Sequence, residues 1–359
     1  MPTKYLYQPD YAVPPGATLK ETLEGKGLSQ ADLALRTGLA EKTISQIING
    51  IAPLSYETAE KLELVLGVPA HFWNARERSY REMLVKIEEA ENLENDVDWL
   101  KEIPLATLIE RRCIQNVNDK RSLVREALRF FGVSSVEAWH NTWRVPAAQY
   151  RGGAAQDRHP GYVAAWLRIG ELQAEAIHTS PFAAGRFRSV LAEARKLVLL
   201  PLKEALSKLA ELCASAGVAV VLTKEIRNAG VSGAVRWISK DKALIQLSLK
   251  YKTHDQLWFT FFHEAAHILL HGKRQVFIEY GISKATNEEE EEEASVFAGD
   301  ILIPTAYQHR LPYLKTRAEI SAFAQSIGIT PGIVVGRLQH DNLVYPSAFN
   351  DLKRKVDWE

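Results

Sequence analysis

The sequence predicts an α+β fold that is mostly helical, and three observations lead to that prediction. Segments with the period of a helix, separated by glycine and proline, fill most of residues 1–215. From residue 216 the pattern changes to short β-branched or alternating runs, GVAVVL, SGAVRWIS and ALIQLSLKY, which indicate strands. A long apolar helix and an acidic helix follow, and the second ends at Pro304. Strands late in the chain, flanked by helices, are typical of an α+β module.

Composition narrows the class of protein. At 359 residues, 46% hydrophobic and 25% charged, the chain is long enough for two or three globular domains. Cys113 and Cys213 show no CxxC spacing, as expected of thiols in a reducing compartment. No apolar signal segment and no run of 18 apolar residues occurs, so we expect a cytoplasmic protein without a membrane partner. The 44 basic and 44 acidic residues balance, and any nucleic-acid binding must therefore come from a local surface.

The positions of glycine and proline, together with shifts in composition, predict three regions, 1–85, 86–215 and 216–359. In the first, turn residues separate five short helices, expected at 18–25, 29–36, 41–48, 55–66 and 69–85. The acidic stretch Lys86–Asp98 is either a linker or an exposed helix end.

The middle region is helical, and the sequence assigns it no role. Arg168 and Arg195 are expected to be solvated. The aromatic residues of this region are expected in a core: Phe130, Phe131, Trp139, Trp143, Trp166 and Phe182.

Residues 29–49 have the spacing of a helix-turn-helix. Ser29 is placed as an N-cap, Gly38 permits a left-handed turn, and Ile44 and Ile47 face inward. The second helix of such a motif enters the major groove of DNA. A small helical bundle that binds a protein has similar spacing, which leaves that alternative open. The residues left facing outward are Ala40, Glu41, Lys42, Thr43, Gln46 and Asn49.

Residues 16–80, which include TISQIING and LGVPAHFW, resemble the HigA-type antitoxin branch of the Cro/C1 (XRE) helix-turn-helix repressors. The resemblance implies a lambda-repressor-like bundle of five helices that binds operator DNA as a homodimer. Residues 1–85 contain nine Lys and Arg against ten Asp and Glu, so a large non-specific affinity for DNA is not expected. By position, the resemblance places Ala40, Glu41, Lys42 and Gln46 against bases and Gln30, Thr43 and Asn49 against phosphates.

His263-Glu264-Ala265-Ala266-His267 is an HExxH motif inside an apolar helical pattern. His263 and His267 are one turn apart on one face, so both imidazoles can bind one Zn²⁺. Glu264 lies beside that face, where its carboxylate can act as general base toward a metal-activated water. A surface helix with two satisfied histidines is the alternative. The apolar flanks WFTFF and ILL favour a buried helix, in which these polar groups need partners that a metal supplies.

A catalytic zinc site needs a third protein ligand. His271 is one more turn along the same face, but three histidines stacked on one straight helix do not readily converge on one metal. A carboxylate from residues 288–298 (EEEEEEASVFA) is the better candidate. Most of these glutamates are expected to be solvated, but Ala294, Phe297 and Ala298 turn one side of the helix inward.

Residues 215–345 resemble the ImmA/IrrE family of zinc-dependent endopeptidases, of the gluzincin type, through HExxH and the later EEEASVFAGDILIP. The resemblance implies a zincin-like domain with Glu291 as third zinc ligand, although Glu292 or Glu293 can take its place because the glutamates are consecutive. It places Ser295 behind a ligand histidine, where the family has Asn or Asp. It also implies that Ala243–Leu249 is an edge strand able to accept a substrate peptide.

Together these regions predict a DNA-binding transcriptional regulator that is also a zinc endopeptidase. Its substrate would be a regulatory protein, either a repressor or a toxin–antitoxin partner. The alternative is a HigA-like antitoxin or repressor whose zinc is structural or sensory, and the intact Glu264 favours the enzyme. Residues 318–340 also have the look of a helix-turn-helix, but in ImmA/IrrE-like chains this segment belongs to the helical C-terminal part.

Overall fold

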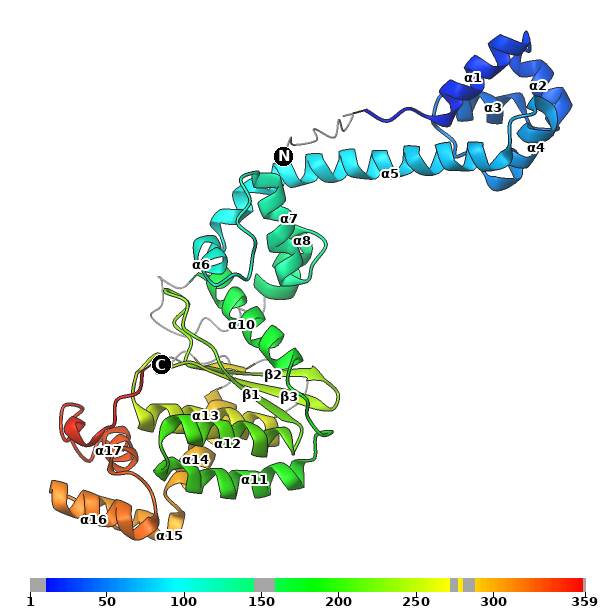
Figure 1. Cartoon of the computed structure of the whole chain (residues 1–359). Helices are drawn as coiled ribbons and strands as arrows, with labels where there is room; N and C mark the ends of the chain where they lie inside the picture. Colours follow the sequence, from blue (N-terminus) through cyan, green and yellow to red (C-terminus); the bar gives the residue numbers. More distant parts are fainter. Residues whose placement is uncertain (1–10, 145–158, 272–276, 280–287, 358–359) are drawn as a thin grey trace, which may run out of the picture. The chain divides into compact units, whose positions relative to one another are not determined.

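The computed structural model describes residues 11–144, 159–271, 277–279 and 288–357 of the chain (Figure 1). The chain divides into two compact units, residues 1–97 and residues 98–359. The predicted mostly helical α+β fold is confirmed, and the small mixed sheet belongs to the second unit.

The first unit is the expected bundle of five helices. Its core is apolar and includes Leu33, Ile44 and Trp73, each at most 1% exposed. Residues 86–95 of the acidic stretch form the largely exposed end of the last helix and not a linker. The helices are α1 (Pro15–Lys26), α2 (Gln30–Thr37), α3 (Glu41–Ile48), α4 (Tyr56–Leu66) and α5 (Ala70–Asn95).

Helices of the middle region belong to the second unit. The predicted aromatic core is confirmed: Phe131, Trp139 and Trp166 are at most 1% exposed, while Phe182 is half-buried against Trp237. The elements up to the sheet are η1 (Asp96–Lys101), α6 (Leu105–Glu110), α7 (Lys120–Phe131), α8 (Val136–Trp139), η2 (His140–Arg144), α10 (Pro160–Glu175), α11 (Ala184–Lys196), η3 (Leu197–Leu199) and α12 (Leu202–Ala214).

Four strands form the sheet in the order β1-β3-β2-β4. They are β1 (Val218–Leu222), β2 (Gly233–Ser239), β3 (Lys242–Leu247) and β4 (Phe277–Glu279). β3 runs parallel to β1 and antiparallel to β2, and β2 also pairs antiparallel with β4. The expectation that Ala243–Leu249 forms an edge strand is therefore wrong. β3 is hydrogen-bonded on both sides, in keeping with side chains that are buried on both of its faces.

Helices cover both faces of the sheet, with α10 on one face and α12 and α13 (His254–Leu270) on the other (Figure 1). Alternate side chains of β3 face the two helical layers in turn. Ile245 packs in the large core with α13, whereas Leu244 packs with Ala174 of α10. Gln246 also faces α10, and its Nε2 donates to the Trp166 carbonyl at 2.7 Å.

The C-terminal elements complete the core on the α13 side. They are α14 (Glu288–Leu302), α15 (Thr305–Gln308), η4 (Leu311–Tyr313), α16 (Arg317–Ile327), α17 (Pro331–His340) and η5 (Asn350–Leu352).

Two arginines expected in solvent are held by the protein instead. The Arg195 guanidinium donates to the carbonyls of Ile301, Leu302 and Ile327, and so caps the C-terminal ends of α14 and α16. Arg168 Nε donates to the Phe130 carbonyl at 2.8 Å.

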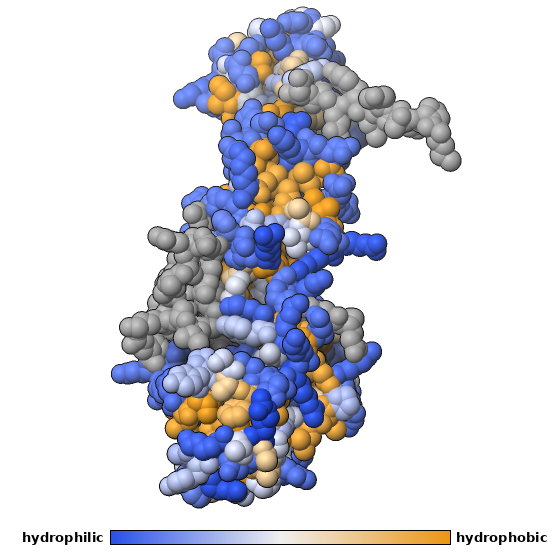
Figure 2. Space-filling view, turned by 90° about the vertical axis from the view of Figure 1, so that its left-hand side faces the viewer, coloured by the Kyte–Doolittle hydropathy of each residue, from blue (hydrophilic) through white to orange (hydrophobic). Residues whose placement is uncertain are grey.

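The outer surface in Figure 2 is mostly polar, with apolar side chains gathered in separate patches. Among the described residues no single helix has the length and apolar character needed to cross a membrane. Within the same described ranges, α16 and α17 taken together pass that test on length and composition, and the pair is bent by 111°.

Candidate functional site

The HExxH motif lies in the second half of α13, which is buried along almost its whole length. His263 and His267 are 3% and 2% exposed, and Glu264 is fully buried. Phe261 and Phe262, just before the motif, and Ala265 within it belong to the large apolar core. The apolar flanks thus bury the helix, and the spacing of four residues places the two imidazoles edge to face, with ring centroids 4.8 Å apart.

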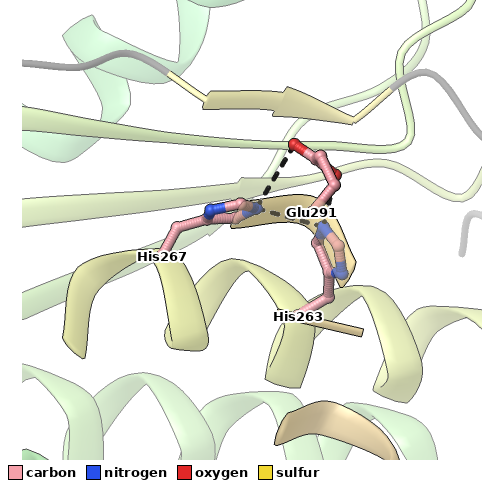
Figure 3. A group of neighbouring side chains, drawn as sticks. All are labelled: His263, His267 and Glu291. Atoms are coloured by element: carbon pink, nitrogen blue, oxygen red, sulfur yellow. Dashed lines mark hydrogen bonds and ion pairs between the residues drawn. The ribbon is translucent and has the colours of Figure 1, made fainter. Parts of the chain in front are cut away.

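Helix α14 brings Glu291 to these imidazoles (Figure 3). Ala294 and Ala298, both fully buried, face α13 and allow the two helices to pack closely. Glu291 Oε2 lies 3.1 Å from His263 Nε2, and Glu291 Oε1 lies 3.6 Å from His267 Nε2. The two Nε2 atoms are 3.1 Å apart. Two separate helices therefore direct the possible metal-ligand atoms of three residues at one point.

This donor set fits a metal ion. Each of the three residues offers one ligand atom, and these atoms all lie within 4.8 Å of one another. Tetrahedral ligands 2.0–2.1 Å from a zinc ion are about 3.3 Å from each other, close to the separations found here. Burial, with the neighbouring His263 and His271, lowers the pKa of His267 to about 2, so its ring is neutral as a metal ligand must be.

The geometry distinguishes the consecutive glutamates. Glu291 faces both histidines of the motif, Glu292 is exposed, and Glu293 Oε2 lies 3.2 Å from His271 Nε2. Ser295 Oγ is 3.4 Å from His263 Nδ1, a long contact behind the ring that faces Glu291.

The Glu264 side chain points at the first residue of β2. A Cβ atom on Gly233 would lie 2.5 Å from Glu264 Oε1 and 2.5 Å from Thr260 Cγ2, so only glycine leaves room for the carboxylate. Sequence reasoning missed Gly233, although a glycine at the start of a predicted strand signals a close approach of another group.

A phenol or an imidazole can donate a hydrogen bond to a developing oxyanion, and Tyr280, Tyr307 and His309 carry such groups on the C-terminal side of the motif. Tyr280 lies outside the described residues, and Tyr307 and His309 are exposed at and after α15.

In the first unit, α2 and α3 form the predicted helix-turn-helix. Ser29 Oγ accepts from the Asp32 amide as N-cap, and Gly38 has the left-handed φ of 70°. None of the predicted DNA-facing side chains is buried, whereas Ile44 and Ile47 are 1% exposed. Asn49 Nδ2 donates to the Ser45 carbonyl at 2.8 Å, which turns its amide back on its own helix. The exposed set is Ala40, Glu41, Lys42 and Asn49, and the partly exposed set is Gln30, Thr43 and Gln46.

Comparison with known protein families agrees with both halves of this description. The helix-turn-helix family model matches residues 19–73, and the model of the IrrE N-terminal-like domain of peptidase family M78 matches residues 220–339. No curated protein matches the chain. The HigA-type assignment stays a prediction. The chain thus carries an N-terminal helix-turn-helix domain, of the kind found in DNA-binding regulators, and a C-terminal IrrE-like domain of a metallopeptidase type.

Proposed function

We propose that the protein is a DNA-binding regulator whose second unit is a zinc-dependent endopeptidase acting on a regulatory protein. The observation that supports this most is the group of His263, His267 and Glu291 with Glu264 on the same buried helix. A structural zinc site fills all its positions with protein ligands, whereas three protein ligands leave one position for water or substrate.

The side chains divide the chemistry between them. His263, His267 and Glu291 would hold the metal; when bound, zinc supplies Lewis acidity toward a peptide carbonyl and toward water. The Glu264 carboxylate would take the proton from the attacking water and deliver it to the leaving amine. Gly233 leaves the space that this carboxylate occupies, and the surrounding apolar core excludes bulk solvent.

In the first unit, the outward side of α3 would read DNA. Lys42 and Gln46 are the side chains best suited to base edges, and the N-terminal end of α3 supports phosphate contacts. Because residues 1–85 have no excess of basic residues, binding would depend on these specific contacts more than on counterion release.

The first experiment measures the metal content of the purified full chain and of four variants. We expect one zinc per chain in wild type, loss of zinc in His263→Ala and Glu291→Ala, and retention in Glu264→Gln. Glu292→Ala, one residue beyond Glu291 and exposed, is the matched control and should keep its zinc.

The second step incubates zinc-loaded wild type and Glu264→Gln with a mixed peptide library and identifies new termini by mass spectrometry. Cleavage by wild type alone supports the endopeptidase. A wild-type chain that binds zinc and cuts no peptide would favour the alternative, a repressor or antitoxin with a structural or sensory zinc. A wild-type chain that takes up no zinc would remove the enzyme proposal altogether.

A further inference from the structure

His271 and Glu293 form a chain of hydrogen-bonding groups behind the metal-binding edge of His267. His267 Nδ1 is 2.8 Å from His271 Nδ1, and His271 Nε2 is 3.2 Å from Glu293 Oε2. Building on the metal site of the proposed function, we propose that this relay is a positioning device. It holds His267 in the one tautomer that presents its Nε2 to the metal.

The proton positions follow from the chemistry of the two ends. A histidine that binds a metal through Nε2 carries its proton on Nδ1. His267 Nδ1–H then donates to His271 Nδ1, which must be the unprotonated nitrogen of that ring. His271 consequently carries its proton on Nε2 and donates it to the Glu293 carboxylate. A carboxylate at the far end therefore fixes both rings, and neutral tautomers satisfy each contact.

This arrangement also explains why His271 does not converge with His263 and His267. It meets His267 at Nδ1, the ring atom on the opposite edge from the Nε2 that faces Glu291. The backbone contributes, because α13 ends at Leu270 and His271 has extended φ and ψ of −111° and 165°. A side chain that continued the helix would project along the same face; this one folds back on the preceding turn.

Different groups lie behind the two ligand histidines. His263 has the Ser295 hydroxyl at 3.4 Å behind its ring, beyond the usual O–H···N distance. His267 has the 2.8 Å contact with His271, whose side chain is 4% exposed, so this hydrogen bond is shielded from water. Glu293 is 66% exposed, and its hydrogen bond competes with solvent. We therefore expect His271 to matter much more than Glu293.

The experiment measures zinc affinity of the full chain by competition with a chromogenic chelator. His271→Leu removes the acceptor and should weaken zinc binding 10- to 100-fold, the range found when a partner behind a ligand is lost. His271→Gln keeps an amide oxygen that can accept from His267 Nδ1–H and should recover most of that loss. Glu293→Ala should weaken binding a few-fold relative to Glu292→Ala, its exposed neighbour.

A second readout does not depend on any variant. Long-range ¹H–¹⁵N correlation spectra of the zinc-loaded wild type should show His271 as the Nε2–H tautomer and His267 as the Nδ1–H tautomer. His271 found with its proton on Nδ1 would overturn the relay. The relay would also be overturned if His271→Leu and His271→Gln both bound zinc as tightly as wild type. It would likewise be overturned if both variants lost the same affinity, because an equal loss indicates a role in packing and not in hydrogen bonding. These results leave the proposed function standing, whereas failure of wild type to bind zinc removes the proposed function itself.

Discussion

The chain contains two helix-turn-helix segments that are locally alike and globally different. α2 begins with a capping box between Ser29 and Asp32, and α16 begins with one between Thr316 and Glu319. Each first helix ends at a left-handed glycine whose amide donates to an alanine carbonyl four residues earlier. The paired glycines are Gly38, with a φ of 70°, and Gly328, with a φ of 71°.

The second helices have opposite surroundings. In α3 two residues, Ile44 and Ile47, are buried, and the opposite side is open to solvent. In α17 four consecutive residues from Gly332 to Val335 are buried, and Gly336 lies against Asp255 of the helix that carries the HExxH motif. The same turn therefore leaves one side of the second helix open to solvent in one unit and packs the second helix against α13 in the other. What covers the second helix, and not the turn, separates a candidate DNA reader from a structural support.

A buried charge on α17 should have the largest effect. Val334 is fully buried, so Val334→Asp places a carboxylate in the core and should lower the free energy of unfolding of the second unit by about 4 kcal/mol. Urea unfolding followed by tryptophan fluorescence measures this, since seven of the eight tryptophans follow Asp98.

The corresponding change on α3 is Lys42→Asp, at an exposed position. It should alter the unfolding free energy by less than about 0.5 kcal/mol. It should nevertheless reduce binding to duplexes that wild type selects from a random pool, since it puts a negative charge against DNA. Equal stability losses in the two variants would mean that α3 is not an open face.

Lowering the pH should destabilise the second unit through His254, which lies at the start of α13 and contacts α17. Its Nδ1 is 3.5 Å from the hydroxyl of Thr330, the N-cap residue of α17, and its Nε2 accepts from Trp258 Nε1 at 2.9 Å. Burial, reinforced by Arg354 and opposed by Asp255, lowers the pKa of His254 from 6.5 to about 4.

The unfolded chain thus binds more protons than the folded chain between pH 6.5 and pH 4. Stability of the second unit therefore falls as pH falls through that window, by up to about 3 kcal/mol from this residue. His254→Gln keeps an acceptor for Trp258 without a titrating ring, and should show a correspondingly shallower loss in urea unfolding at pH 4 to 7. Parallel curves for the two proteins would show that His254 is not the group that titrates.

The sequence predicted those features that depend on neighbours along the chain. The HExxH spacing placed His263 and His267 on one face, and the apolar edge of residues 288–298 pointed to an inward glutamate, where the structure brings Glu291. Capping residues and glycines likewise located the helices of the first unit to within a few residues, except at the end of α5.

Features that depend on tertiary pairing were not predictable in this way. β3 is internal because β1, which precedes β2 in the chain, pairs with it on the side away from β2. The alternation of apolar residues within a strand does not show which other strands will pair with it. Arg195 donates to helix-end carbonyls that lie 106 to 132 residues later in the chain. His271 was visible as a third histidine, but its pairing with Glu293 required the packing of α14 on α13.

The smallest predicted effect concerns the element that the two segments share. At Gly38 and Gly328 a Cβ atom would meet nothing within 4 Å, so alanine at either position is opposed only by the left-handed backbone. Gly38→Ala and Gly328→Ala should each cost about 1 kcal/mol, equal within a few tenths. Native-state hydrogen exchange of peptides from α2 and α16 measures the two costs separately in the full chain. A clearly larger cost at Gly328 would show that burial of α17 constrains its turn as well, and that the segments differ already at the turn. Equal costs would assign their whole difference to what packs on the second helix.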